Sequence, residues 1–484
     1  MAHIEFVDET FRDGMQSLWG MRMQAGMALP AAGDLDQTGF RRIELTGSNH
    51  FEVLVRYCRE NPWQMLDALV DAMPRTVIRS GMRSNAMATF RTSPDALMDA
   101  WMRQLCRHGC RSFWIYDLLY NVDKMLRLAR VAKEFGAEAV GSIMFTLSPV
   151  HDDAYFAAKA AALSASPDID TILLYDTAGV LSTERLQTLL PAIIASSNGK
   201  PVEFHANNLL GQSTRNYLDA IALGVDIVHT ASRPMANGPS VPSTEIMAHN
   251  IELLGHTHNL DKSRFKPVAD HMERVGTAAG FLVNQHAEYD ILSIRHQIPG
   301  GMTGTLKAQL AQHGMSDRLD DVLREVALVR AELGYPGMAT PFSQLVGIQS
   351  VLNLVTGDRY GTVPDEIIQY ALGYYGQPAA PIDANVLDRI MGSARAAQVR
   401  AAPPEQPSIE DLRARHGTQD DDELLLRVMI PETDLERMRA AGPLARDYPL
   451  LSSRDLDQAR HLMQIATIPS VQFRSGELSL QLRR

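Results

Sequence analysis

Cysteine is scarce in this chain of 484 residues, which contains only Cys58, Cys106 and Cys110. Three cysteines are too few, and odd in number, for the disulfide framework of a small secreted protein. No apolar stretch approaches the roughly 20 residues that a membrane-spanning helix needs. The first residues, MAHIEFVDET, lack the basic and apolar regions of a signal peptide. We therefore expect a cytoplasmic protein with no membrane span.

Basic residues are outnumbered, because 46 Lys and Arg stand against 57 Asp and Glu and give a net charge of −11. An acidic chain is a poor general partner for nucleic acid or an anionic membrane, since both carry negative charge. The hydrophobic content of 45% and the charged content of 21% are those of an ordinary globular protein. We expect no nucleic-acid partner.

The sequence does contain a regular alternation of strand-like and helix-like segments. Amphipathic stretches such as SPDALMDAWMRQLCRHG separate eight short runs rich in Val, Ile, Leu and aromatic residues, at 3–10, 41–47, 75–83, 112–119, 137–147, 170–179, 201–208 and 225–232. Eight strands alternating with helices over about 250 residues predict a (β/α)8 TIM barrel. The lack of a Gly-rich fingerprint after any strand disfavours the alternative, a doubly wound open sheet.

The pattern becomes helical toward the C-terminus, so we predict a TIM barrel followed by a helical C-terminal extension. We expect a catalytic barrel domain over residues 1–300 and a helical extension of that domain over 301–395. A polar, Pro-bearing linker is expected over 396–412, followed by a small helical appendage over 413–484 that is a candidate docking region for other subunits. The last residues, VQFRSGELSLQLRR, alternate weakly, like a hairpin strand.

Chemically active side chains gather at the predicted strand ends. In TIM barrels the catalytic groups stand at the C-terminal ends of the strands and in the loops that follow. Read in chain order, these positions carry Arg12, Asp13, Gln16, Glu44, Thr46, Arg83, Asp117, Met144, Thr146, Tyr175, Asp176, His205, Asn207 and Thr230. We interpret Asp117 and Asp176 as framework carboxylates.

Asp13, His205 and Asn207 form the candidate metal site. Carboxylate and imidazole suit a hard or borderline divalent metal, and Asn207 points the same way as His205 because it lies two residues further along one strand. Arg12 and Arg83 beside such a metal would bind a substrate carboxylate and stabilise a developing enolate. Two structural alternatives stay open: His205 as a hydrogen-bonded framework group, and Arg12–Asp13 as an ion pair within the loop.

Six segments carry more specific motifs. They are RDGMQSLWGMRM (12–23), GMRSNAMATFRTSPD (81–95), ALGVDIVHTASRPMANG (222–238), HQIPGGMTGTLKAQL (296–310), RAELGYPGMATPFSQLVGIQSVLNLVTGDRY (330–360) and YGQPAAPID (375–383). With these motifs the chain resembles the carboxyltransferase domain of pyruvate carboxylase, the oxaloacetate decarboxylase alpha subunit and the transcarboxylase subunit of the same lineage. The resemblance covers roughly residues 3–440 and implies the same barrel fold.

The resemblance implies roles for several side chains. Asp13 matches the family's metal-binding aspartate, and His205 matches the first histidine of a His-x-His metal pair. Arg12 and Gln16 match the neighbours that hold the substrate oxygens, and Arg83 matches the arginine that binds the keto-acid carboxylate. The implied reaction decarboxylates carboxybiotin and passes the carboxyl group to an enolate such as that of pyruvate, or runs in reverse, with Zn, Mn or Mg as the metal.

The chain departs from the family pattern at five places. Tyr175 stands where the family has a carbamylated lysine, and Asn207 stands where it has the second histidine. Pro239 replaces a threonine that shuttles a proton, with Ser240 beside it, and Met15 replaces a histidine. No Ala-Met-Lys-Met biotinylation motif is present, so any biotin would have to arrive in trans on another polypeptide.

Three functions are consistent with these residues. The first is a carboxyltransferase or decarboxylase subunit that moves a carboxyl group to or from the enolate of a small 2-oxo or related acid. The second is a biotin-independent, metal-dependent C–C lyase or decarboxylase, which the segment DTAG (176–179) favours; there Tyr175 either acts as a general acid or simply packs in the barrel. The third is a non-catalytic scaffold subunit paired with an active paralogue.

The first function is the one we favour. It implies a small carboxylic-acid substrate, carboxybiotin from a separate biotin carrier and biotin carboxylase subunit, and a homo- or hetero-oligomer. The candidate catalytic residues are Arg12, Gln16, Arg83, Tyr175 and Ser240.

Overall fold

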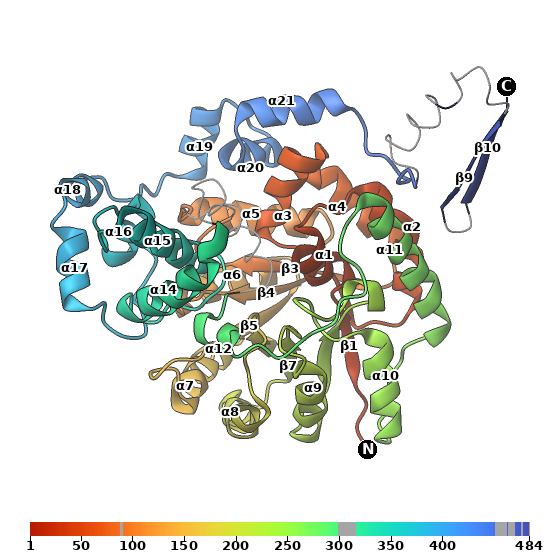
Figure 1. Ribbon diagram of the computed structural model, residues 1–484, viewed down its shortest axis with the longest axis horizontal. Helices are drawn as coiled ribbons and strands as arrows, with labels where there is room; N and C mark the ends of the chain where they lie inside the picture. Colours follow the sequence, from red (N-terminus) through yellow and green to blue (C-terminus); the bar gives the residue numbers. More distant parts are fainter. Residues whose placement is uncertain (88–90, 299–315, 451–461, 463–469, 476–477, 484) are drawn as a thin grey trace.

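The computed structural model describes residues 1–87, 91–298, 316–450, 462, 470–475 and 478–483. Eight parallel strands pair in sequence order, and the first and last pair with each other, so the sheet closes into a barrel (Figure 1). The strands are β1 (Glu5–Asp8), β2 (Arg42–Thr46), β3 (Val77–Arg83), β4 (Ser112–Tyr116), β5 (Glu138–Met144), β6 (Thr171–Asp176), β7 (Val202–Ala206) and β8 (Ile227–Thr230). Each lies within one of the eight predicted runs, so the predicted TIM barrel is confirmed.

Helices surround the barrel on the outside (Figure 1). They are α2 (Ala25–Gln37), α3 (Ser48–Val53), α4 (Pro62–Ala72), α5 (Asp95–Arg107), α6 (Val122–Glu134), α7 (Asp153–Ser164), α8 (Thr183–Ser196), α9 (Ser213–Ala222), α10 (Thr244–Leu253) and α11 (Phe265–Ala279). The short helix α1 (Met15–Trp19) lies at one end of the barrel, where Gln16 and Trp19 line a cavity. Short turns of other helix types are η1 (Thr10–Gly14), η2 (Leu54–Cys58), η3 (Arg233–Met235) and η4 (Lys262–Arg264).

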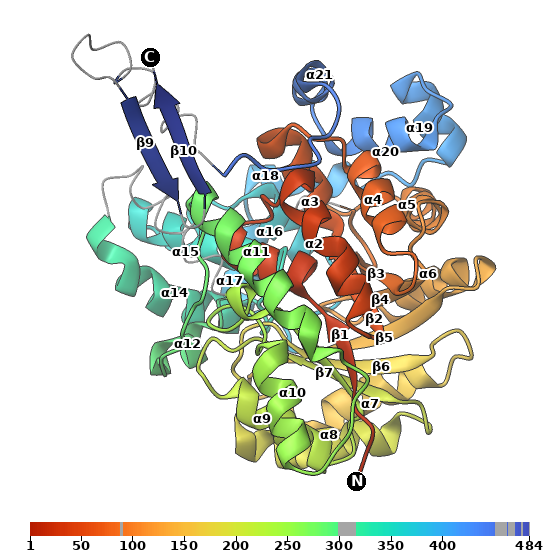
Figure 2. The ribbon, with the colours of Figure 1, turned by 90° about the vertical axis from the view of Figure 1, so that its right-hand side faces the viewer.

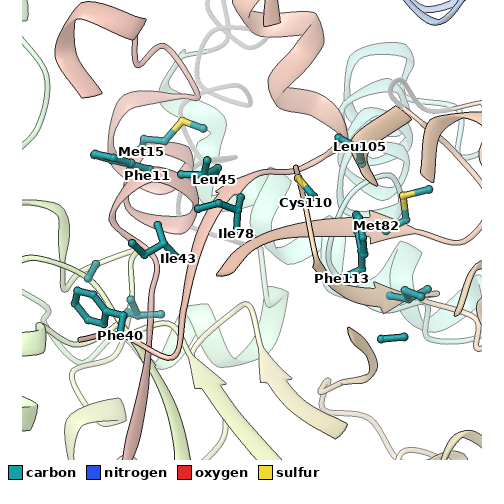
Figure 3. Close-up of a cluster of buried hydrophobic side chains, with 14 of the residues drawn as sticks. Phe11, Met15, Phe40, Ile43, Leu45, Ile78, Met82, Leu105, Cys110 and Phe113 are labelled. Carbon is teal, nitrogen blue, oxygen red and sulfur yellow. The ribbon is translucent and has the colours of Figure 1, made fainter. Parts of the chain in front are cut away.

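Sequence signals explain where these elements begin and why they stay buried. Ser182 caps α8, because its Oγ accepts a hydrogen bond from the backbone N–H of Arg185 at 3.2 Å. Every residue of β6 is buried, as expected for a parallel strand covered on both faces. Figure 3 shows part of this buried packing: Ile43 and Leu45 of β2 lie toward Phe11 and Met15, whereas Met82 of β3 and Phe113 of β4 lie on the side of Cys110 and Leu105 of α5.

A second group of helices follows the barrel: α12 (Ile291–His296), η5 (Ser316–Arg318), α14 (Leu319–Glu332), α15 (Phe342–Thr356), α16 (Asp365–Ala371), α17 (Ala384–Met391) and α18 (Ala394–Ala401). Their buried side chains, including Val326 and Phe342, share one hydrophobic cluster with Trp114, Met144 and Tyr175 of the barrel. The predicted helical extension therefore packs on the barrel at β4, β5 and β6. The expected boundary at residue 300, and most of the 296–310 motif, lie outside the described residues.

The linker predicted over 396–412 is shorter in the structure. Helix α18 ends at residue 401 and α19 (Ile409–His416) begins at 409, which leaves residues 402–408 as the connection. The alanine-rich start of the predicted linker favours a helix, and Ser408 with Asp411 forms a capping box that starts the next one.

The C-terminal appendage is only partly helical. Helices α20 (Asp421–Met429) and α21 (Glu432–Ala441) follow α19 on the side of the barrel that carries α3, α4 and α5 (Figure 2). Strands β9 (Ser470–Ser475) and β10 (Leu478–Arg483) form an antiparallel hairpin, which the alternation at the end of the sequence had indicated. Among the described helices, none is long and apolar enough to span a membrane.

Candidate active site

The first loop folds as a π-helical turn, η1, that turns its polar side chains into the barrel. The hydroxyl of Thr10 donates to Asp8 at 2.8 Å and anchors the turn to the end of β1. A Cβ on Gly14 would lie 2.8 Å from the carbonyl oxygen of Met235, so only glycine fits there without movement of the neighbouring loop. As a result, Arg12 and Asp13 are each only 2% exposed.

Arg12 is enclosed by acidic and aromatic side chains. Its guanidinium forms ion pairs with Glu9 at 2.6 Å and with Glu44 at 2.9 Å. Nη1 of Arg12 donates to the phenolic oxygen of Tyr175 at 3.0 Å, and the guanidinium lies 5.3 Å from the ring centre of Trp114. These contacts fix Arg12 in one position, with two acidic side chains beside its guanidinium. The loop ion pair with Asp13 is present but long, at 3.4 Å.

Burial and the ion pairs shift the pKa values of this cluster in opposite directions. Burial lowers the pKa of Arg12, but Glu44 and Glu9 outweigh it, so its pKa lies well above the usual value. Burial raises the pKa of Glu44 to about 8, although Arg12 acts against this shift. Burial also raises the pKa of Glu9, but Arg12 and the hydrogen bond from His205 outweigh it and hold that pKa well below its usual range.

Asp13, His205 and Asn207 come together, as predicted, but they meet through hydrogen bonds. The amide Nδ2 of Asn207 donates to Asp13 Oδ2 at 3.0 Å and to the carbonyl oxygen of Pro239 at 2.6 Å. The hydroxyl of Ser240 donates to the same Asp13 oxygen at 3.0 Å. His205 Nε2 lies 3.8 Å from Asp13 Oδ1.

This arrangement does not fit a metal ion at Asp13. His205 Nε2 and Asn207 Oδ1 are buried without a hydrogen-bond partner, which by itself would suit a ligand role. However, N–H and O–H groups occupy the Asp13 carboxylate, and Asn207 presents its amide hydrogens rather than its oxygen to that carboxylate. A cation would have to displace these donors, so the residues around Asp13 do not fit a metal ion at this position.

Tyr175 packs against His205 and Trp114. Its ring centre lies 4.0 Å from that of His205 and 5.1 Å from that of Trp114. Burial raises the pKa of Tyr175 well above its ordinary value, so the phenol keeps its hydrogen at neutral pH. Since the phenolic oxygen accepts from Arg12, its own O–H is available to donate elsewhere.

Two adjoining cavities open at this end of the barrel, one of 70 Å³ and one of 530 Å³. Arg12, Gly81, Trp114, Tyr116 and Met144 line the small cavity, and Asp13, Asn207 and Pro239 line the large one. Both are lined by Gln16, Asn49, Tyr175, Thr177, Ala339 and Thr340. Because Ala339 and Thr340 lie between α14 and α15, the helical extension forms one wall of the site.

Arg83 lies at the end of β3, as predicted, but it is only 2% exposed. Its Nη2 donates to Asn49 Oδ1 at 2.9 Å. Asn49, and not Arg83, lines both cavities. Burial lowers the pKa of Arg83. The structure therefore places the expected carboxylate-binding arginine behind Asn49.

Asp176 and Asp117, at the ends of β6 and β4, support the loops that follow them. Asp176 accepts a hydrogen bond from the backbone N–H of Leu181 at 2.7 Å, and burial raises its pKa to about 6. Asp117 accepts hydrogen bonds from Ser84 and from the backbone N–H of Leu119. These contacts agree with the interpretation of both aspartates as framework groups.

Sequence reasoning gave no role to four polar residues in the barrel interior. Arg79 of β3 binds Glu203 of β7 with both terminal nitrogens, at 2.5 and 3.0 Å. Glu203 Oε2 lies 2.9 Å from Nε2 of His229, and Nδ1 of His229 lies 2.8 Å from Oε1 of Glu9. For Glu203 a signal was present: it alternates with His205 along β7, so the two side chains point to one side of the strand.

Taken together, these features define the class of protein: a TIM barrel whose mouth is charged, contains two cavities and has one wall made of helices. Comparison with known proteins gives the family. A profile described as a conserved carboxylase domain matches residues 294–466. A subunit of the pyruvate carboxylase of Methanocaldococcus jannaschii is 31% identical over 453 residues, which cover 92% of this chain and 80% of that protein.

Two further proteins extend the comparison. The 2-oxoglutarate carboxylase large subunit of Hydrogenobacter thermophilus is 28% identical over 88% of this chain and 67% of its own length. The carboxyl transferase domain from Rhizobium etli pyruvate carboxylase, solved with pyruvate and biocytin, superposes with a TM-score of 0.82 at 21% identity, covering 91% of this chain and 77% of that one. The chain belongs to the carboxyltransferase family of the pyruvate carboxylases, and the expected family is thereby confirmed.

Proposed function

We propose that this chain is a carboxyltransferase subunit that moves a carboxyl group to or from the enolate of a small 2-oxo acid. The observation that carries the proposal is the Arg12–Tyr175 pair, because both side chains line the small cavity and are joined by a 3.0 Å hydrogen bond. An N–H and an O–H donor fixed at one point can stabilise the negative charge that develops on an enolate oxygen.

The small cavity is the proposed acid site. At 70 Å³ it excludes all but a small acid, and Gln16, Asn49 and Thr177 add polar groups around the Arg12–Tyr175 pair. We propose that Arg12 and Tyr175 bind the keto oxygen, while Gln16 and Asn49 contact the carboxylate. Arg83 then acts as a positioning residue that orients Asn49 through the 2.9 Å hydrogen bond.

The adjoining large cavity is the proposed entry for the carboxyl carrier. Its volume of 530 Å³ is within the range of ordinary small-molecule sites. Biotin on a separate carrier would supply or accept the carboxyl group there. The residues of this chain hold the acid beside that entry and keep water away from the enolate. We assign Ser240 to holding Asp13 in place, because its hydroxyl is buried and donates to that carboxylate.

The assembly and the cofactors follow from the same proposal. A carrier in trans requires separate biotin carrier and biotin carboxylase subunits and a surface on which they dock. We propose that the appendage formed by α19, α20 and α21 contributes to this docking surface. We propose that the chain works in a homo- or hetero-oligomer and binds one divalent ion, Zn, Mn or Mg.

Exchange of the hydrogens on carbon 3 of 2-oxo acids with deuterium tests the enolate step alone. The purified chain in heavy water would be followed by NMR with pyruvate, 2-oxobutyrate and 2-oxoglutarate in turn. We expect exchange above the buffer rate for at least one acid. Tyr175→Phe should slow it by about 10- to 100-fold, because it removes the O–H donor.

Tyr116→Phe is the matched control, because Tyr116 lines the same cavity and also carries a phenol. Its exchange rate should stay within about threefold of wild type, well short of the loss expected on removing a proton donor. Exchange no faster than buffer with every acid would contradict the proposal and favour the scaffold function.

One observation favours a second candidate, a biotin-independent decarboxylase. Tyr175 stands at the position of the family's lysine, and its phenol together with Arg12 could stabilise an enolate left by loss of CO2. Loss of CO2 from oxaloacetate at the same rate with and without biotin would support this candidate.

A further inference from the structure

Three buried side chains from neighbouring strands converge inside the barrel, beneath the Arg12–Tyr175 pair. Glu9 follows β1, His229 is in β8 and His205 is in β7, and these strands pair in the order β1, β8, β7. All three residues are buried, with an exposed fraction of 0%. They form the one group of three or more His, Cys, Asp and Glu side chains with metal-ligand spacing among the described residues.

The three facing atoms form a nearly equilateral triangle. Glu9 Oε1 lies 2.8 Å from His229 Nδ1 and 3.2 Å from His205 Nδ1, and the two Nδ1 atoms lie 3.2 Å apart. Atoms that bind one divalent ion at about 2.1 Å lie about 3.0 to 3.4 Å from each other. Two of the three distances lie within this range and the third, at 2.8 Å, is slightly shorter, so only a small movement of Glu9 or His229 would be needed for the three atoms to bind one face of an ion. Two imidazoles with one carboxylate are a common ligand set of this kind.

The surroundings orient His229 for this role. Its other ring nitrogen, Nε2, lies 2.9 Å from Glu203 Oε2, and Arg79 holds that carboxylate through two nitrogens. A carboxylate that accepts the N–H of a histidine leaves the opposite nitrogen with its lone pair pointing at the metal. The Arg79–Glu203 pair thus provides the outer support that histidine ligands usually have.

We propose that Glu9, His205 and His229 bind a divalent ion such as Zn²⁺, Mn²⁺ or Fe²⁺, one level deeper in the barrel than Asp13. His205 takes part through Nδ1, and Asp13 keeps its hydrogen bonds to Asn207 and Ser240. The ion fixes Glu9 and, through the 2.6 Å ion pair, the position of Arg12. The proposal does not rest on the reaction, because metal content is measured without any substrate.

X-ray absorption spectroscopy of the wild-type protein, loaded with Zn²⁺ during expression, is the first test. The proposed site gives two imidazole ligands for each ion, whereas the Asp13, His205 and Asn207 set would give one. A count of two supports the proposal. A count of one, or a protein that holds no ion after loading, overturns it.

Metal content of three matched variants is the second test. We expect Glu9→Gln and His229→Gln to lower the affinity for the ion at least tenfold, while Asp13→Asn keeps about one ion per chain. Circular dichroism would confirm that each variant is folded. Loss of the ion in Asp13→Asn with retention in the other two would overturn the proposal. The wild-type ligand count decides the question if Glu9→Gln or His229→Gln fails to fold.

Discussion

Glu60 shows, at the scale of one residue, how the fold changes the chemistry of a side chain. Its Oε2 accepts a hydrogen bond from the backbone N–H of Ala25 at 2.8 Å, which ties the end of η2 to the start of α2. Only 8% of Glu60 is exposed, and burial raises the pKa of its carboxyl to about 7. The folded protein therefore binds a proton here more tightly than the unfolded chain does.

A group of this kind makes stability depend on pH. Because the pKa is raised, from 4.5 unfolded to about 7 folded, the stabilising contribution is complete below pH 4.5 and is lost as the pH rises through 7. Glu60→Gln removes the titration and keeps an oxygen that can accept from Ala25. As the pH rises from low to neutral, we expect the free energy of unfolding of the variant to increase by about 1 to 3 kcal/mol relative to that of wild type.

Urea unfolding of both proteins over this pH range measures the difference. A constant difference between the two proteins at all pH values would show that Glu60 ionises normally in the folded state.

At the same scale, the sequence predicted which residues meet but not how they meet. Arg12, Asp13, Tyr175 and His205 were placed at one mouth because every strand of a parallel barrel ends there. Whether Asn207 would offer oxygen or hydrogen to Asp13 depends on an amide rotation that no spacing encodes. These contacts depend on side-chain orientation, which is set by the packed interior.

At the scale of elements, Gly81 determines how closely β3 and β4 approach the cavity. A Cβ at Gly81 would lie 2.5 Å from the ring of Trp114, whose indole N–H donates to Glu44. Gly81→Ala should displace Trp114, lower stability by about 1 to 3 kcal/mol and weaken binding of the acid in the small cavity. Chemical unfolding and a pyruvate titration measure the two effects.

Gly33 in α2 offers a matched control, since a Cβ there would meet nothing within 4 Å. Gly33→Ala should raise stability by about 0.5 to 1 kcal/mol, because alanine favours a helix. If both substitutions changed stability and acid binding equally, the close contact between Gly81 and Trp114 would not be what sets the shape of the small cavity.

The elements themselves were largely readable from the sequence. Strands covered on both faces must be continuously apolar, so the eight runs stood out. Arg79 and His229 are polar exceptions within these apolar strands. Their role was not predicted, because a single polar residue in an apolar run gives no periodic pattern. Polarity and proline alone predict a linker over 396–412, whereas the alanine-rich segment before residue 402 forms helix α18.

At the scale of the whole molecule, the C-terminal appendage is tied to the barrel by His108. Its Nε2 lies 3.0 Å from Asp422 at the start of α20, and its ring stacks on Trp63 at 4.6 Å. Leu424 and Leu435 of the appendage are fully buried in the same hydrophobic cluster as the barrel core. The appendage is thus packed on the barrel rather than attached by a free linker.

This contact should weaken as the pH rises. Burial lowers the pKa of His108, but the hydrogen bonds to Asp422 and Asp67 outweigh it, so the pKa is raised above 6.5. A raised histidine pKa gives stability that is complete below pH 6.5 and is lost as the pH rises through the folded-state value. We expect proteolysis within α20 and α21 to speed up over that range in wild type.

His108→Gln, which has no charge to lose, serves as the control for that measurement. Its cleavage rate should change little beyond the change in protease activity itself. The same acceleration in both proteins would mean that His108 does not control docking of the appendage.

Exchange of a carboxyl group between two 2-oxo acids would test the proposed transfer reaction itself. Isotopically labelled pyruvate and unlabelled oxaloacetate would be mixed with the chain, with and without biocytin as the free form of the carrier group. We expect label to appear in oxaloacetate only when biocytin is present, because the carboxyl group must pass through it. Release of CO2 at the same rate in both mixtures, with no label in oxaloacetate, would contradict a carboxyltransferase function.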